Sequence, residues 1–252
     1  MKYFKDFQDI FYNFGNEAQP TLVQNISRYV DVVDQIKDDI SFLTFYTIQE
    51  GYRPDQVSVQ LYDTPLYYWT FYLLNDDIRE QGWPLTNIEF QNYIKKIFPN
   101  TTVTTRENIT TKFKVGQTIT GNTSGVSGKI IRRNTDLGQI IVEGKPSFAI
   151  SGETFTSTNS SGALESIIAV SSSDEHKAAN YYTDTTGICD LGIDSDVTSP
   201  TYGGHLPPGA LKNEITNEQA YYNVNESLRQ IRVIRPNLIN NVVSGYKKAI
   251  RE

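Results

Sequence analysis

The amino-acid sequence predicts an α+β protein made of several modules, and three features support this prediction. Residues 45–100 combine a β-type run with short apolar helical segments, and residues 101–173 are rich in Thr, Ser and Gly and contain an internal repeat. Residues 216–252 follow a helix–strand–helix pattern. A chain of 252 residues is long enough to form two or three small domains, each with its own core.

The composition argues against several classes of protein. The net charge of −6 argues against nucleic acid as a partner, because no overall positive field favours binding to phosphates. Cys189 is the only cysteine, so no internal disulfide is expected. Asp6 and Asp9 interrupt the apolar pattern of a signal peptide, and the longest apolar run, residues 66–74, is too short for a membrane span. We therefore expect no membrane partner and a protein made in a cytoplasm.

The N-terminal region 1–44 is predicted to hold an aromatic arm and an amphipathic helix. Residues 1–20 are crowded with aromatic side chains, which need cover from the protein's own core or from a neighbouring protein. Both alternatives stay open. The apolar positions of the predicted helix recur at spacings of three and four, and they are Leu22, Ile26, Tyr29, Val33, Ile36 and Ile40.

The region 45–100 is predicted to contain three helices after a strand over 42–48. The first helix follows Arg53-Pro54, because proline suits the first helical position. Asp63-Thr64 can cap a second helix that begins after Pro65.

The second helix is unusually apolar. Residues 66–74 are apolar except at Thr70, which predicts a helix buried on all sides and ended by Asn75. A turn at Gly82-Trp83-Pro84 precedes the third helix. Its predicted apolar positions are Ile88, Tyr93, Ile94 and Ile97.

The region 101–173 is predicted to be a small all-β module. The segment VGQTITGNTSGVSGKI at 115–130 matches ISGETFTSTNSSGALESI at 150–167, so that Gly116 aligns with Gly152 and Thr120 with Thr156. Two copies are too few for a solenoid. They favour a pseudo-twofold β-barrel or sandwich.

The C-terminal third begins with a predicted loop or extended arm over 174–215, where Gly, Pro, Asp and Thr dominate. Thr216-Asn217-Glu218-Gln219 fits a capping box and opens a helix to about Leu228. A strand is predicted over 229–235, and a last helix begins at Pro236.

The strand and helix over 229–252 are strongly basic. The segment has one acidic residue, Glu252, and six basic residues, which are Arg229, Arg232, Arg235, Lys247, Lys248 and Arg251. We predict that this segment docks on a partner protein. The alternative is that it folds back on the acidic region 31–55 of its own chain.

Two separated blocks of sequence resemble one known family. The pattern Y-x-I-x-x-G-x-R-P-x-x-V at 46–57, the run LYDTPLYYWTFYLLND at 61–76 and the GWP at 82–84 resemble the LysM-like domain of a baseplate wedge protein from contractile-tailed, T4-like phages. The C-terminal stretch NESLRQIRVIRPNLINNVVSGYKKAIRE at 225–252 is similar to the C-terminal segment of that family. The resemblance covers about half of the chain.

The resemblance implies a LysM-like helical and β module, with 101–173 as an inserted module and 216–252 as a docking segment. It implies a structural subunit of the virion's tail baseplate, not an enzyme, without a cofactor or metal. The expected partners are other wedge proteins and the hub-proximal or sheath-initiating tail proteins. The residues expected at interfaces or in structural roles are Arg53, Pro54, Tyr62, Pro65, Trp69, Asn75, Trp83, Pro84, Leu228, Arg229, Ile231, Arg232, Val233 and Ile234.

A second hypothesis is a LysM-type protein that binds peptidoglycan. Trp69 and Trp83 lie among several tyrosines, and aromatic faces suit pyranose rings. The same aromatic residues equally fill a small core or a protein interface. Arg53-Pro54 stands where glycan-binding LysM domains have a Gly-Asp-Thr turn, which weakens the carbohydrate hypothesis.

Sequence patterns for catalysis and metal binding are weak. His176 and His205 are the only histidines, and both lie in the predicted loop region. Asp190, Asp194 and Asp196 are close in sequence, but their spacing differs from that of a calcium-binding loop.

Overall fold

The computed structural model describes residues 9–13, 15, 19–25, 37 and 41–251. It is a mixture of helices and strands, which confirms the predicted α+β class. The chain forms two compact units, the first made of residues 1–86 and 225–252 and the second of residues 87–224. The C-terminal segment therefore belongs to the unit that contains most of the region 45–100.

A short hairpin forms the described part of the N-terminal region. Strands β1 (Asp9–Tyr12) and β2 (Thr21–Gln24) pair antiparallel. Leu22 lies in β2, so the amphipathic helix predicted to include it does not begin there. Its other apolar positions, from Ile26 to Ile40, lie outside the described residues, as do residues 1–8 of the aromatic arm.

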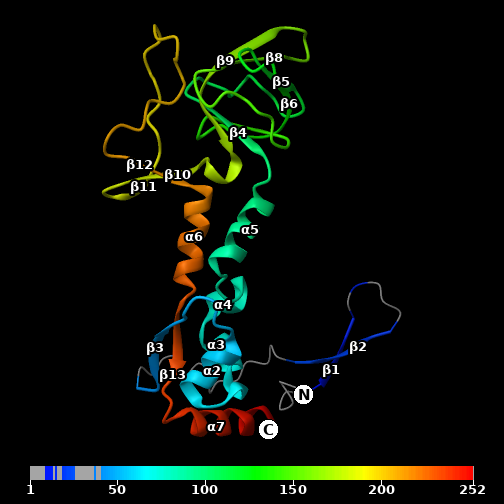
Figure 1. The fold of residues 1–252 in the computed structure, drawn as a ribbon, viewed down its shortest axis with the longest axis vertical. Coiled ribbons are helices and arrows are strands. Elements are labelled where there is room, and N and C mark those ends of the chain that lie inside the picture. The colour runs from blue at the N-terminus through cyan, green and yellow to red at the C-terminus, as the bar shows by residue number, and fades with distance from the viewer. Residues whose placement is uncertain (1–8, 14, 16–18, 26–36, 38–40, 252) are drawn as a thin grey trace. The chain divides into compact units, whose positions relative to one another are not determined.

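The first unit is built on a two-stranded antiparallel sheet. Strands β3 (Leu43–Thr47) and β13 (Gln230–Ile234) lie side by side (Figure 1). Their register places Phe45 opposite Arg232. Both strands agree with the sequence prediction. Their pairing joins segments at opposite ends of the chain.

Short helices follow β3. They are α2 (Pro54–Tyr62), the 3₁₀ turn η1 (Pro65–Tyr67), α3 (Trp69–Leu74) and α4 (Asp76–Gln81). Pro54 begins α2 as expected, and the Thr64 hydroxyl accepts a hydrogen bond from the Leu66 N–H at 3.4 Å. The predicted all-round burial of 66–74 is wrong, because Leu66 is 51% exposed and the run is divided between η1 and α3.

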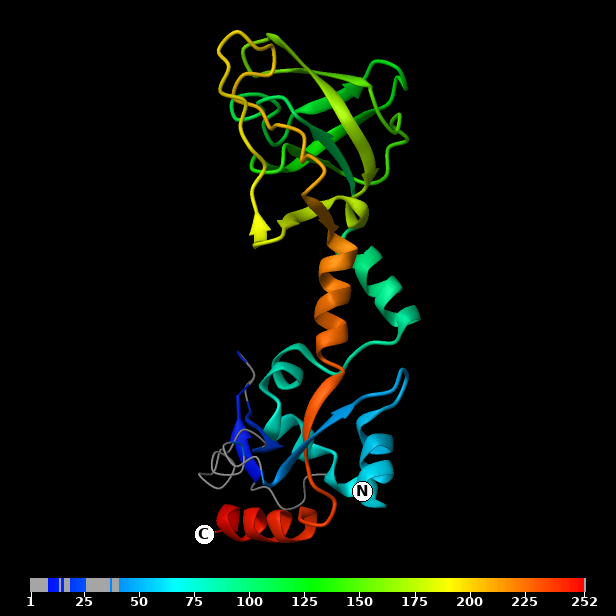
Figure 2. The same ribbon diagram turned by 90° about the vertical axis from the view of Figure 1, so that its left-hand side faces the viewer.

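Helix α7 (Ile239–Arg251) completes the first unit (Figure 2). One apolar core joins the sheet to the helices, and its buried members include Leu43, Val57, Phe71, Ile231, Val233 and Tyr246. Because β13 and α7 supply many of these side chains, the C-terminal segment is part of this core.

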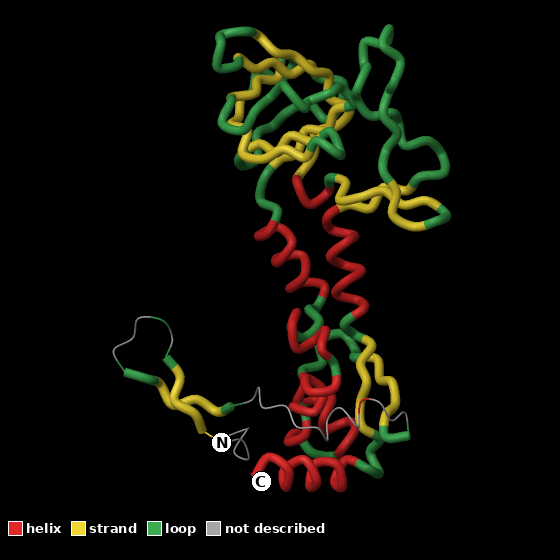
Figure 3. Tube along the Cα trace, turned by 180° about the vertical axis from the view of Figure 1, so that it is seen from behind, coloured by secondary structure: helices red, strands yellow, loops and turns green. Residues whose placement is uncertain are grey.

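Helices α5 (Asn87–Ile97) and α6 (Asn217–Ser227) run side by side in the second unit, although the last residues of α6 belong to the first unit (Figures 1 and 3). The ring of Phe90 lies 5.7 Å from that of Tyr222, and Phe98 lies 5.4 Å from Tyr221. The predicted apolar face of α5 is therefore mostly wrong. Ile94 is buried, but the other three predicted positions, Ile88, Tyr93 and Ile97, are exposed.

The second unit contains a closed six-stranded barrel, which is one of the two alternatives, barrel or sandwich, that the repeat favoured. Its strand order is β4-β7-β6-β5-β8-β9. The strands are β4 (Thr101–Thr105), β5 (Thr118–Gly121), β6 (Ser127–Asn134), β7 (Gln139–Val142), β8 (Thr154–Thr158) and β9 (Leu164–Asp174). Buried Ile, Val and Phe side chains from all six strands fill the interior.

The two repeats meet at a local twofold relation in the barrel. Strands β5 and β8 pair antiparallel with Thr120 opposite Thr156, its equivalent in the other repeat. Glu153 in the second repeat accepts hydrogen bonds from the N–H groups of Thr123 and Ser124 in the first, at 3.1 and 2.6 Å. A side chain at Gly121 would collide with this carboxylate, since an added Cβ would lie 2.3 Å from Glu153 Oε1.

The loop predicted over 174–215 is wrong for part of its length. Strands β10 (Ala179–Asp184), β11 (Gly187–Cys189) and β12 (Asn213–Thr216) form a three-stranded sheet in the order β11-β10-β12. Composition obscured these short strands, and the pairing of β10 with β12 spans a long connection. Thr216 caps α6 as predicted, because its hydroxyl accepts the Gln219 N–H at 3.1 Å.

Candidate functional site

Two of the predicted site residues, Tyr62 and Asn75, bind strand β13. The Asn75 side chain donates from Nδ2 to the Arg232 C=O at 2.8 Å and accepts the Arg232 N–H on Oδ1 at 2.7 Å. The Tyr62 hydroxyl donates to the Ile234 C=O at 3.0 Å. Burial raises the pKa of Tyr62, so its phenol stays a hydrogen-bond donor. These side chains fasten β13 along the edge that faces away from β3.

Both tryptophans have structural partners within the first unit. Trp69 is buried, and its ring lies 5.1 Å from that of Tyr246 on α7. The Trp83 indole N–H donates to the Tyr52 C=O at 2.7 Å, and its ring packs on Phe71 at 6.2 Å. These contacts favour the core interpretation of the aromatic residues over the sugar-platform interpretation.

The junction between α6 and β13 is fixed by polar contacts to Leu85, next to Pro84. The Asn225 side chain accepts the Leu85 N–H at 2.8 Å and donates to its C=O at 3.1 Å. Arg229 donates to the same C=O at 3.3 Å and to Glu226 at 2.7 Å, while Leu228 is buried. Leu228 and Arg229 thus hold β13 in register with the helical part of the unit.

Three predicted site residues lie at helix starts. Arg53 precedes Pro54 at the start of α2, and its guanidinium bonds the Asp55 carboxylate at 2.7 Å. This hydrogen bond lowers the pKa of Asp55. Pro65 begins η1 and is exposed. These residues set local geometry and also lie on the surface.

The structure departs from the prediction that β13 is a docking strand. Ile231, Val233 and Ile234 are almost fully buried in their own unit. The strand pairs with β3, which lies in the region 31–55, so the fold-back alternative describes the structure. The attraction is not mainly one of charge, because apolar burial and backbone hydrogen bonds hold the strand.

One part of the sheet remains available to a partner. Phe45 on β3 is 68% exposed, and the exposed Arg232 lies opposite it on β13. Sequence reasoning missed Phe45. A signal was present, because successive strand residues point to opposite faces and the adjacent aromatics Phe45 and Tyr46 cannot both face one core.

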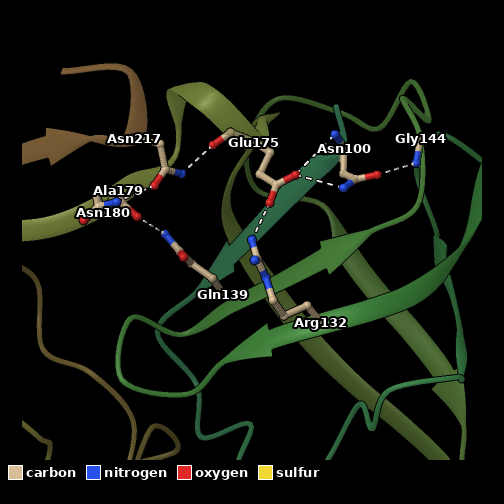
Figure 4. Close-up of polar contacts among 8 residues, drawn as sticks. All are labelled: Asn100, Arg132, Gln139, Gly144, Glu175, Ala179, Asn180 and Asn217. Carbon is tan, nitrogen blue, oxygen red and sulfur yellow. Dashed lines mark hydrogen bonds and ion pairs between the residues drawn. The ribbon is translucent and has the colours of Figure 1, made fainter. Parts of the chain in front are cut away.

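A polar junction in the second unit connects the barrel to the β10 strand and α6 (Figure 4). The Glu175 carboxylate pairs with Arg132 and accepts from Asn100 Nδ2 at 2.9 Å. The Asn217 side chain donates to the Glu175 C=O at 2.7 Å, and Gln139 donates to the Ala179 C=O at 2.8 Å. Sequence reasoning missed this cluster, because its members are far apart in the chain.

A polar hollow of about 570 Å³ lies beside this junction, lined in part by Thr102, Arg132 and Tyr221. Arg132 is engaged with Glu175. The arrangement accounts for how the barrel is fastened within its unit.

The weak catalytic and metal candidates lie elsewhere in the second unit. His205 Nε2 lies 2.8 Å from the Thr135 C=O, and His176 is buried 4.0 Å from Glu218. Burial lowers the pKa of His176. Asp194 and Asp196 accept hydrogen bonds from their own loop.

Among residues 41–251 and the described N-terminal positions, no cluster of three or more His, Cys, Asp or Glu side chains has metal-binding geometry. In the same part of the chain, no helix is long and apolar enough to cross a membrane. Compared with models of known protein families and with curated proteins, the sequence matches none.

Proposed function

We propose that this chain is a structural subunit of the baseplate wedge of a contractile phage tail. In this role it joins neighbouring wedge proteins into the ring around the hub. Its partners are other wedge proteins and the hub-proximal or sheath-initiating tail proteins, and its site of action is the virion. The role requires no turnover and no cofactor.

One observation carries the proposal. The two sequence blocks that resemble the wedge family, 46–84 and 225–252, are far apart in the sequence, yet they belong to one unit with one core. The pairing of β3 with β13 joins them. A resemblance that spans both blocks is therefore a resemblance to one folded body, which strengthens it.

The finer fold assignment belongs to the same proposal. We propose that the first unit is a LysM-like module, in which β3 is followed by the short helices α2, α3 and α4 and the module is closed by the strand β13. The second strand comes only after residues 87–224. In this interpretation the barrel with α5, β10 to β12 and α6 is an insertion within the module.

Affinity purification tests the proposed partners. The chain, tagged and expressed from a plasmid, is recovered from cells in which the parent phage is assembling. We expect baseplate wedge proteins among the co-purified proteins. Their levels should be higher than in a control purification with an unrelated soluble protein that carries the same tag. Recovery of no tail protein would contradict the proposal, and saturable sedimentation with purified peptidoglycan would favour the cell-wall hypothesis.

A further inference from the structure

The two edges of the β3–β13 sheet differ in whether side chains protect their outward backbone groups. In this antiparallel pair the Ile48 N–H donates to the Arg229 C=O at 2.8 Å, and the Arg235 N–H donates to the Phe42 C=O at 2.9 Å. The backbone N–H and C=O groups of even-numbered residues of β3 therefore point toward β13, and those of odd-numbered residues point away from it. On β13 the outward residues include Arg232 and Ile234.

The outward edge of β13 is closed by side chains. Asn75 takes both the N–H and the C=O of Arg232, and Tyr62 takes the C=O of Ile234. Such protection prevents the addition of another strand.

The outward edge of β3 is open at its centre. The Leu43 C=O accepts from Arg235 Nε at 3.1 Å, but within the described part of the chain no group hydrogen-bonds the backbone of Phe45 or Thr47. The strand sequence Leu-Thr-Phe-Tyr-Thr has no charged residue and no proline. Such residues usually prevent an edge strand from pairing with another strand. We call the outward backbone of Leu43, Phe45 and Thr47 the open β3 edge.

We infer that the open β3 edge pairs antiparallel with the same edge of a second copy, centred on Phe45. The result is a four-stranded sheet in the order β13-β3-β3-β13. The pairing gives hydrogen-bond partners to the backbone N–H and C=O groups that the open β3 edge presents in each copy. Because Asn75 closes the β13 edge, the described residues leave this sheet one open edge in each copy, and the assembly ends at a dimer. The inference does not depend on the proposed function.

Side-chain chemistry favours a second copy as the occupant. Pairing centred on Phe45 matches all five residues of the strand, with Leu43 opposite Thr47 of the other copy. It places the two exposed Phe45 rings as cross-strand neighbours, an arrangement that stabilises antiparallel pairs. No like charges meet along the uncharged edge.

Disulfide cross-linking tests both the pairing and its register. The background carries Cys189→Ser, which removes the only native thiol. In the proposed dimer the two residues at position 45 form a hydrogen-bonded pair with Cα atoms about 5.5 Å apart, within disulfide range. We expect Phe45→Cys to give a covalent dimer under mild oxidation with copper phenanthroline.

Thr47→Cys in the same background is the matched control. In the proposed register, position 47 faces position 43, so the two introduced thiols lie about 13 Å apart along the strands and cannot join. Equal cross-linking of the two variants, or none with Phe45→Cys, would overturn the inference.

Sedimentation equilibrium of the intact chain gives an independent readout. We expect a concentration-dependent doubling of the 28.5 kDa mass, abolished by Phe45→Lys and retained by Leu66→Lys, which alters another exposed apolar residue of the same unit. A monomer at every concentration up to several hundred micromolar would overturn the inference. So would equal loss of the dimer in both lysine variants, because it would place the contact elsewhere. None of these outcomes bears on whether the chain is a tail protein.

Discussion

The side-chain amide of Asn75 forms with the backbone of Arg232 the two hydrogen bonds that a neighbouring strand would form. The two residues are 157 positions apart in the sequence. Asn75 lies directly after α3, so this one residue both ends the helix and protects the edge of β13. The C-terminal strand is thereby fastened on two sides.

Replacement of Asn75 tests this relationship. We expect Asn75→Ala to lower the free energy of unfolding of the first unit by about 1–2 kcal/mol, because two hydrogen bonds to Arg232 are lost. Trp69 and Trp83, the only tryptophans, both lie in this unit, so urea titration followed by tryptophan fluorescence reports on it. Asn241→Ala, an exposed asparagine on α7, should change little, and an equal effect of both variants would contradict the assigned role.

Truncation of Trp69 tests the core. We expect Trp69→Ala to destabilise the first unit by about 3–5 kcal/mol, since its buried ring packs on Tyr246 and its removal leaves a cavity. Thermal unfolding followed by the fluorescence of Trp83 measures the loss. Leu66→Ala, at a half-exposed position on η1, serves as the control and should cost much less. An unchanged melting temperature in Trp69→Ala would instead identify Trp69 as a surface contact.

Removal of the C-terminal segment should unfold the first unit. A chain that ends at Leu228 lacks Ile231, Val233 and Tyr246, which are buried in the core. We expect its tryptophan fluorescence to show no cooperative transition, whereas a chain that ends at Lys247 keeps these three residues and the transition. Cooperative unfolding of the shorter chain at wild-type stability would contradict this account and restore the docking-segment hypothesis.

Local signals allowed much of the fold to be predicted. Pro54 at a first helical position located α2, and Thr216 located the start of α6. The alignment of Thr120 with Thr156 predicted the twofold character of the barrel, in which these residues face each other. Each of these features depends on residues near one another in sequence or on a repeat.

Long-range contacts account for what the sequence did not reveal. The buried stripe at α5 consists of Phe90, Ile94 and Phe98, which are spaced by four residues. The sequence offers other apolar positions on the same helix, and the predicted face was built mainly on these, which are exposed. Likewise, the strand character of β13 was predicted, but its pairing within the chain on region 31–55 was only the alternative to docking on a partner protein. Hydrophobic alternation shows that a strand needs cover and does not say which segment supplies it.

The candidate site was predicted less well than the fold. Tyr62, Asn75 and the tryptophans were identified as residues for interfaces or structural roles, and the structure gives them intramolecular, structural contacts. Phe45 was missed because its exposure depends on the face that β3 turns to the core. The Glu175 junction was missed because no local pattern links Asn100, Arg132 and Asn217.

The buried Glu153 should make the barrel sensitive to acid. Burial alone would raise the pKa of Glu153, but N–H donors from Ser124, Ala149 and Thr123 hold it below its usual 4.5. Folding thus favours the ionised form of Glu153. The stability that this charge contributes is present at neutral pH and is lost as the pH falls below 4.5 and through the lowered pKa of the folded state.

Hydrogen exchange compares Glu153→Gln with the wild type at each pH. We expect the variant to lose about 1.5–3 kcal/mol of protection at Thr123 and Ser124 near pH 7, because charge-assisted hydrogen bonds are lost. The difference should shrink on acidification, when the wild-type carboxyl is protonated. Glu143→Gln, at an exposed position, is the control. A difference independent of pH would show that the charge of Glu153 does not stabilise the barrel.

The most direct test of the proposed function is quantitative mass spectrometry of purified virions of a contractile-tailed phage, chosen because its genome carries this sequence. Particles are separated by density gradient, and tails are then isolated from disrupted particles. The account predicts peptides from both units of this chain in the tail fraction, at a constant molar ratio to the other baseplate proteins. Absence of these peptides from intact virions in which other baseplate proteins are readily detected would contradict it.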